Sequence, residues 1–171
     1  MMNFHKIKEI LFNFLPLILL YFLSFNNFST LKEYEILIIF SFNLKMIIIY
    51  YFVLKFPDNL GLGHIFLAGI INDTVIGIPL GTSSLSYLIL SAFSSYVRNI
   101  TLRSKMLVEW FAFIPALFFS NLVYFIIINN FSNLSFYYVE LLRNSFFTFL
   151  FFPFFYYFFN FILILTKKTN A

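Results

Sequence analysis

Residues 69–81, with the sequence GIINDTVIGIPLG, decide how the rest of the chain is arranged. Gly69, Asp73 and Gly77 lie four residues apart, so a helix would place them along one face. Small residues at this spacing allow a second helix to approach closely inside a membrane. Pro79 cannot continue a preceding helix, but it suits the first turn of a following one. The stretch therefore predicts the end of one membrane helix, a tight turn beside a carboxylate, and the start of another helix.

The composition around this stretch is that of an integral membrane protein. Of the 171 residues, 61% are hydrophobic and only 11% are charged, and the mean hydropathy is +0.91. A soluble domain of this length carries more charge. The sequence therefore predicts an all-α integral membrane protein with a single polytopic domain over residues 1–171. We interpret the 29 Phe and 11 Tyr as the coding preference of an AT-rich genome rather than as an aromatic binding surface.

Six segments are long and apolar enough, or nearly so, to cross a bilayer, which takes about 20 residues. They cover residues 10–25, 36–54, 60–76, 80–97, 106–128 and 145–165. The first, third and fourth segments are short, and an alternative interpretation is that the third and fourth form a re-entrant pair. Six full spans is the simpler interpretation. No small-residue cleavage site follows the first segment, so we expect it to remain as the first span.

The basic residues test this arrangement, because cytoplasmic loops of membrane proteins carry an excess of Lys and Arg. With the N-terminus inside, eight of the eleven basic residues fall on the cytoplasmic side: Lys6, Lys8, Lys55, Arg98, Arg103, Lys105, Lys167 and Lys168. Lys32 and Arg143 fall on the outer side, and Lys45 falls within the second span. The asymmetry predicts that both termini are cytoplasmic. Basic residues dispersed over span ends do not indicate a nucleic-acid partner.

Lys45 requires its own explanation, since a lysine at the centre of a span costs about 2.5–3.5 kcal/mol on insertion scales. One interpretation is a buried ion pair with Asp73, if the second and third spans are neighbours. In the alternative that we prefer, Asp73 caps the turn at Pro79. Lys45 would then extend to the interface beside Asn43.

No residue pattern predicts catalysis, a cofactor or a metal site. The chain has no cysteine, which excludes disulfides and thiolate metal ligands. His64 is accompanied only by His5 near the N-terminus, so a histidine metal site is not predicted either. No catalytic set or phosphate-binding loop is present, and the sequence therefore indicates a protein that is not an enzyme.

The remaining polar residues of the spans have structural interpretations. Glu109, Glu140 and Arg143 fall near span ends, where we expect them to be solvated. The serines that share one face of the fourth span are expected to serve helix packing through small size and hydrogen bonds. They are Ser84, Ser91 and Ser95.

The central region resembles the signature of the MreD family of rod shape-determining proteins. The sequence FLAGIIND, residues 66–73, is followed by GIPLG, residues 77–81. In that family a Gly, a carboxylate and a Pro-Leu-Gly turn recur in the middle of the chain. The residues that also lie where the family places such residues are Phe56, Pro57, Arg98, Arg103 and Pro153. Elsewhere the similarity is one of length and hydropathy, and Lys45 and the many Phe residues depart from it.

The resemblance implies a multi-pass subunit of the bacterial inner (cytoplasmic) membrane that belongs to the cell-elongation complex. Such a subunit would associate with MreC, with MreB, and with the wall-synthesis transglycosylase and transpeptidase, as well as with the lipid bilayer. No cofactor is implied. The candidates for structural or partner-contact roles are Gly69, Asp73, Gly77, Pro79, Leu80 and Gly81.

The family is also similar to the six-span S-components of energy-coupling-factor vitamin transporters, so the expected bundle is S-component-like. This supplies an alternative function, a membrane component that binds a small substrate. An S-component needs a polar and aromatic pocket that faces outward. The predicted outer loops of this chain are nearly bare of polar side chains, which favours the elongation complex.

Overall fold

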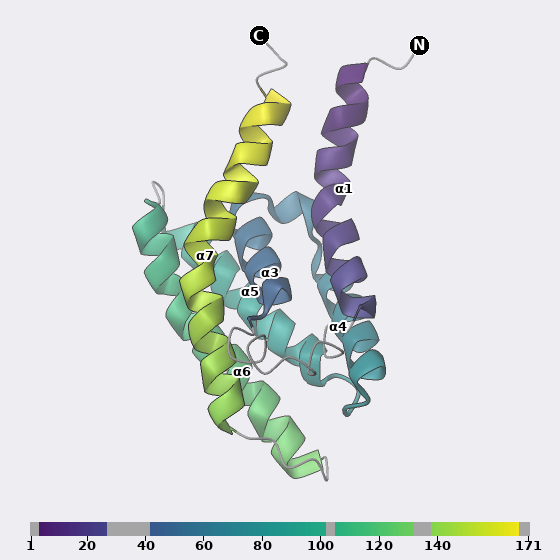
Figure 1. Cartoon of the computed structure of the whole chain (residues 1–171), viewed down its shortest axis with the longest axis vertical. Coiled ribbons are helices and arrows are strands. Elements are labelled where there is room, and N and C mark those ends of the chain that lie inside the picture. Colours follow the sequence, from purple (N-terminus) through teal and green to yellow (C-terminus); the bar gives the residue numbers. More distant parts are fainter. Residues whose placement is uncertain (1–3, 27–41, 102–104, 132–137, 168–171) are drawn as a thin grey trace, which may run out of the picture.

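The computed structural model describes residues 4–26, 42–101, 105–131 and 138–167, which form helices joined by short connections (Figure 1). In chain order these are α1 (Phe4–Phe25), α3 (Leu44–Lys55), the 3-10 turn η2 (Pro57–Asn59), α4 (Leu62–Ile76), α5 (Thr82–Ile100), α6 (Met106–Phe131) and α7 (Tyr138–Lys167). The described residues contain no strand. The predicted all-α class is therefore confirmed for this part of the chain.

The described α-helices alternate in direction along the bundle, so that α1 begins and α7 ends at the same end (Figure 1). Helix α5 packs against α3, α4 and α6. Helix α1 packs against α3 and α4, and α7 packs against α3 and α6. The turn between α4 and α5 lies at the end opposite to the one where α1 begins (Figure 1).

Helix α3 forms the centre of the packed interior. All side chains of residues 46–54 are buried, on every side of the helix. This agrees with its sequence, which is apolar all round and has no polar face to turn toward solvent. The ring of Tyr50 lies 4.5 Å from that of Phe113 in α6, and the ring of Tyr51 lies 5.1 Å from that of Phe159 in α7, between centroids. Part of the Phe and Tyr content therefore fills this core.

Helices α6 and α7 expose apolar side chains over much of their length. Met106–Phe131 and Val139–Ile164 are the two described segments that are long and apolar enough to cross a membrane, by length and composition. Only 28% and 17% of their most apolar 18-residue windows are buried. Core helices of a soluble protein would be mostly buried, and exposed apolar surface of this extent is typical of lipid contact. These two helices indicate membrane association.

The described helices follow the predicted segments in order but differ at several ends. Helix α7 begins at Tyr138, earlier than the predicted residue 145. Residues 36–41 of the second predicted span lie outside the described residues, and α3 begins at Leu44. Lys45 therefore lies in the first turn of α3 and not at the centre of a helix, as the sequence had suggested.

Pro79 is not in the first turn of a helix, which corrects the prediction for this residue. Helix α5 begins at Thr82, after Gly81, whose φ of 96° is left-handed. A left-handed residue cannot belong to a right-handed helix, so the helix starts only after it. Pro79 instead lies in the turn. Its carbonyl accepts hydrogen bonds from the N–H of Thr82 at 3.2 Å and from Oγ1 of Thr82 at 2.6 Å.

Candidate functional site: the turn between α4 and α5

At each end of the turn stands a glycine whose backbone has a left-handed conformation. Gly77 has a φ of 76° and Gly81 a φ of 96°. L-residues rarely adopt such angles, whereas Gly does so without a steric cost. Gly77 ends α4, because its N–H and that of Ile78 both donate to the carbonyl of Asp73, at 2.9 and 3.1 Å. This is the usual glycine termination of a helix.

Gly69 is the glycine at which α4 and α5 approach most closely. A Cβ on Gly69 would lie 2.4 Å from Cα and 2.6 Å from the backbone nitrogen of Ser84. The two helix backbones therefore meet here, and Ser84 Oγ donates to the carbonyl of Phe66 at 2.9 Å. Gly77 has a different role from the predicted one of a packing residue. Helix α4 ends before it, and nothing lies within 4 Å of the position of its missing Cβ.

Asp73 connects both sides of the turn. Its carboxylate is fully buried. Oδ2 accepts from the N–H of Gly81 at 2.8 Å, and Oδ1 accepts from the N–H of Ser83 at 2.9 Å. The first N–H groups of a helix lack partners within it, and a carboxylate there is favoured by the helix dipole. Because the carbonyl of Asp73 also ends α4, this one residue fixes the end of one helix and the start of the next.

The geometry of Asp73 is that of a cap and not of an ion pair with Lys45. Nζ of Lys45 donates to Oδ1 of Asn72, the residue before Asp73. Nδ2 of Asn72 in turn donates to Oγ of Ser83 at 2.8 Å. Among the described residues Lys45 and Asp73 form no direct ion pair, and each carboxylate oxygen of Asp73 accepts from a backbone N–H group. Lys45 nevertheless ties α3 to the α4–α5 turn through Asn72.

The tip of the turn presents one apolar side chain outward. Ile78 is buried at 6% exposure, whereas Leu80 is 69% exposed. Gly77, Asp73 and Gly81 hold the backbone on both sides of this tip. The arrangement can therefore display Leu80 in a fixed orientation, which is what a contact residue requires.

Serine side chains of α5 link it to its neighbours. Oγ of Ser94 donates to the carbonyl of Tyr50 in α3 at 2.8 Å. Oγ of Ser86 lies 2.7 Å from Oγ of Ser120 in α6. Of the predicted packing serines, Ser84 and Ser91 are buried. The sequence prediction missed the helix-to-helix bonds of Ser86 and Ser94, although their small size on an otherwise apolar helix was the available signal.

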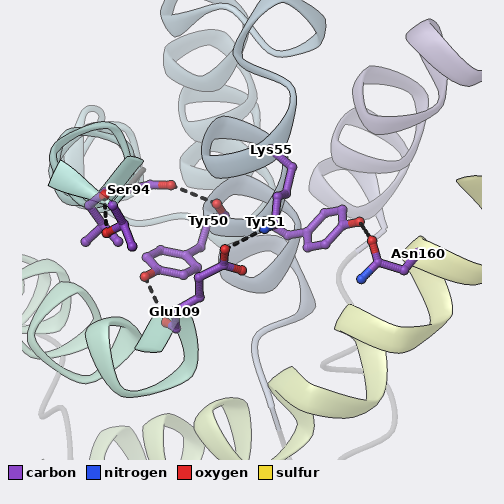
Figure 2. A network of polar contacts seen from close by, with 8 residues as sticks. Tyr50, Tyr51, Lys55, Ser94, Glu109 and Asn160 are labelled. Carbon is purple, nitrogen blue, oxygen red and sulfur yellow. Dashed lines mark hydrogen bonds and ion pairs between the residues drawn. The ribbon is translucent and has the colours of Figure 1, made fainter. Parts of the chain in front are cut away.

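A second polar network lies where α3 ends and α6 begins (Figure 2). Glu109 is fully buried, and its Oε1 accepts from Nζ of Lys55 at 2.5 Å. The backbone carbonyl of Glu109 accepts from the hydroxyl of Tyr50 at 3.0 Å. Beside it, the hydroxyl of Tyr51 donates to Oδ1 of Asn160 in α7 at 2.9 Å. These bonds join α3, α6 and α7 at one end of the bundle.

The prediction that Glu109 is solvated is therefore wrong. A position near the end of a span does not decide exposure, because Lys55 of α3 and the helices around it cover this carboxylate. The sequence did hold a signal for the pair. Lys55 and Glu109 fall at the same predicted membrane side, at the ends of the second and fifth spans.

The other titratable residues do not gather into a site. Nδ1 of His64 lies 3.1 Å from the hydroxyl of Tyr21. The described residues contain no group of three or more His, Asp or Glu that would hold a metal ion. Glu140 is exposed and Arg143 is partly buried. Three basic residues used in the topology prediction lie outside the described residues: Lys32, Arg103 and Lys168.

Comparisons with known proteins do not identify a family for this chain. No protein-family model, no curated protein and no solved structure matches the chain.

Proposed function

We propose that this chain is a non-enzymatic inner-membrane subunit of the bacterial cell-elongation complex, related to MreD, that helps to couple MreC and MreB to lateral peptidoglycan synthesis. One observation carries the proposal: the residues of the family-like signature act together. Gly69 allows α4 to meet α5, Asp73 caps α5, and Gly81 closes the turn. A signature whose parts depend on one another in this way is consistent with a rigid contact element.

The membrane arrangement belongs to the same proposal. We infer six spans, with both termini in the cytoplasm. The alternating helix directions and the shared end of α1 and α7 support this arrangement. Lys55 ends α3, Arg98 lies in the last turn of α5, and Lys105 precedes α6. All three basic residues are thus at the end where α1 begins, as expected for the cytoplasmic side.

The polar groups near the turn favour a scaffold over a vitamin-binding S-component. Asp73 bonds to backbone N–H groups, and Asn72 bonds to Lys45 and Ser83. These groups bind one another, whereas a ligand pocket presents polar groups that remain available to a substrate. The S-component therefore stays the second candidate.

Depletion in a rod-shaped host tests the proposal. We expect rod-shaped cells to become round as the chain is depleted, with re-expression of the wild-type chain restoring the rod. We also expect an affinity-tagged chain, solubilised in mild detergent, to co-purify MreC. The matched control is an equally abundant tagged membrane protein from outside the complex.

Two results would contradict the proposal. One is normal rod shape after depletion together with no enrichment of MreC over the control. The other is loss of uptake of a single vitamin, which would move the assignment to the S-component.

A further inference from the structure

The described helices enclose two fully buried carboxylates, Asp73 and Glu109, which are held in different ways. Both oxygens of Asp73 accept hydrogen bonds from backbone N–H groups. Oε1 of Glu109 accepts from Nζ of Lys55, but Oε2 is buried without a hydrogen-bond partner among the described residues. An ionised carboxylate with an unpartnered buried oxygen is destabilised. Glu109 lies in the first turn of α6, where the helix dipole favours its charge without supplying a bond to Oε2.

Among the described residues, the only hydrogen bond to the carboxylate of Glu109 therefore comes from a side chain that reaches the surface. The side chain of Lys55 is 25% exposed, whereas that of Glu109 is 0% exposed. A lysine stem is flexible, so Nζ can turn away from Glu109 toward water while the helices around the carboxylate stay in place. Glu109 would then be a lone charge in an apolar interior. Such a group becomes neutral by taking up a proton.

We propose that Glu109 is a proton-binding carboxyl for which a proton and the ammonium of Lys55 compete. In one state the carboxylate is paired with Lys55. In the other state Glu109 carries a proton taken from solvent, and Lys55 faces the surface. The charge is balanced, since one positive charge replaces another beside the carboxylate. Because Lys55 is the last residue of α3, the exchange removes the side-chain ion pair between this end of α3 and α6, while the bond from Tyr50 to the backbone carbonyl of Glu109 stays.

Among the described residues, none of the other charged and titratable groups at this end bonds to the carboxylate of Glu109. They are Tyr50 and Tyr51 of α3, Arg98 of α5, Tyr156 of α7 and, just before α6, Lys105. The hydroxyl of Tyr50 donates to the backbone carbonyl of Glu109 and not to its carboxylate. Nη1 of Arg98 donates to the carbonyl of Val53 at 2.9 Å. The ring of Tyr156 lies 5.5 Å from Nζ of Lys55 and supports the ammonium in the paired state.

An apolar carbodiimide reports whether the carboxyl is protonated. Dicyclohexylcarbodiimide enters membranes and reacts with a protonated carboxyl. The carboxyl oxygen bonds to the carbodiimide carbon, the proton passes to a carbodiimide nitrogen, and the product rearranges to a stable N-acylurea. Peptide mass spectrometry then locates the label. The full chain in lipid vesicles is treated across a series from neutral to mildly acidic pH.

We expect labelling of Glu109 in the wild-type chain to rise several-fold as the pH falls, while labelling of Asp73 stays at background. Lys55→Met removes the competing ammonium and should give strong labelling of Glu109 already at neutral pH. Lys55→Arg keeps a cation and should stay low. The matched control is Lys45→Met beside Asp73, which should leave Asp73 unlabelled because backbone N–H groups still hold both oxygens.

The pH series on the wild-type chain needs no substitution, so it decides the question even where Lys55→Met lowers the amount of folded protein. Absence of label on Glu109 throughout the series, or label that does not change with pH, overturns the proposal. Equal labelling of Glu109 and Asp73 also overturns it, since burial alone would then govern the reaction.

Discussion

Helix α4 meets the backbone of α5 at Gly69, which has only a hydrogen atom where other residues carry a Cβ. In Gly69→Ala the new Cβ would lie 2.4 Å from Cα of Ser84, so the two backbones must separate. We expect the free energy of unfolding to fall by about 1–3 kcal/mol, the range for overpacking a close contact. The measurement is the thermal unfolding midpoint of the purified chain in detergent.

Gly63→Ala is the matched control for this change, because Gly63 lies in the same helix with nothing within 4 Å of its missing Cβ. Alanine is favoured over glycine inside a helix by roughly 0.5–1 kcal/mol, so this variant should be at least as stable as the wild type. Equal midpoints for the two variants would exclude the close backbone contact as a source of stability.

The sequence predicts best the positions of residues whose backbone conformation is unusual. Glycine and proline restrict or widen the allowed φ of a residue, and this effect is local, so a turn at residues 77–81 follows from the sequence. The burial of Glu109 is different. It depends on which helices cover the end of α6, and a linear pattern of apolar residues does not contain that information.

Helices α4 and α5 behave as one helical hairpin because Asp73 contributes to both. In Asp73→Asn one carboxylate oxygen becomes an NH₂ group, so the N–H of either Gly81 or Ser83 loses its acceptor. An unsatisfied buried donor costs about 1–3 kcal/mol, and we expect a loss of that size in the free energy of unfolding. Membrane-fraction abundance and the thermal unfolding midpoint measure it.

A pair of double-mutant cycles separates this cap from an ion pair. Lys45→Met is combined with Asn72→Ala in one cycle and with Asp73→Asn in the other. Since Lys45 donates to Asn72, the coupling energy should be larger in the first cycle. A larger coupling between Lys45 and Asp73, with recovery of abundance in the double variant, would restore the ion-pair interpretation.

The sequence predicts the order of the helices along the chain, but it does not predict how deeply each helix is buried in the bundle. Apolar runs of about 20 residues identify membrane helices without reference to their neighbours. Helix α3 is apolar on every side, so its sequence has no polar face to show which side meets lipid and which meets protein. Its central position becomes apparent only from its packing against α1, α5 and α7.

Over the whole molecule, composition and charge predict different properties. The low content of charged residues predicts a membrane protein, and the exposed apolar surface of α6 and α7 agrees with that prediction. Orientation rests instead on the few basic residues. Lys55, Arg98 and Lys105 share the end of the bundle at which α1 begins and α7 ends, which links the charge asymmetry to a single side of the molecule.

Reporter fusions test that orientation directly. A reporter joined after Ala171 should be active if it is an enzyme that works in the cytoplasm, and silent if it is one that works only in the periplasm. A reporter joined after Phe131, the last residue of α6, should show the reverse pattern, because α7 lies between the two fusion points and crosses the membrane. The two fusions control for each other once the amounts of the two fusion proteins in the membrane are matched. Cytoplasmic activity at both positions would remove α7, the helix between the two fusion points, as a membrane span. Periplasmic activity after Ala171 would reverse the proposed orientation.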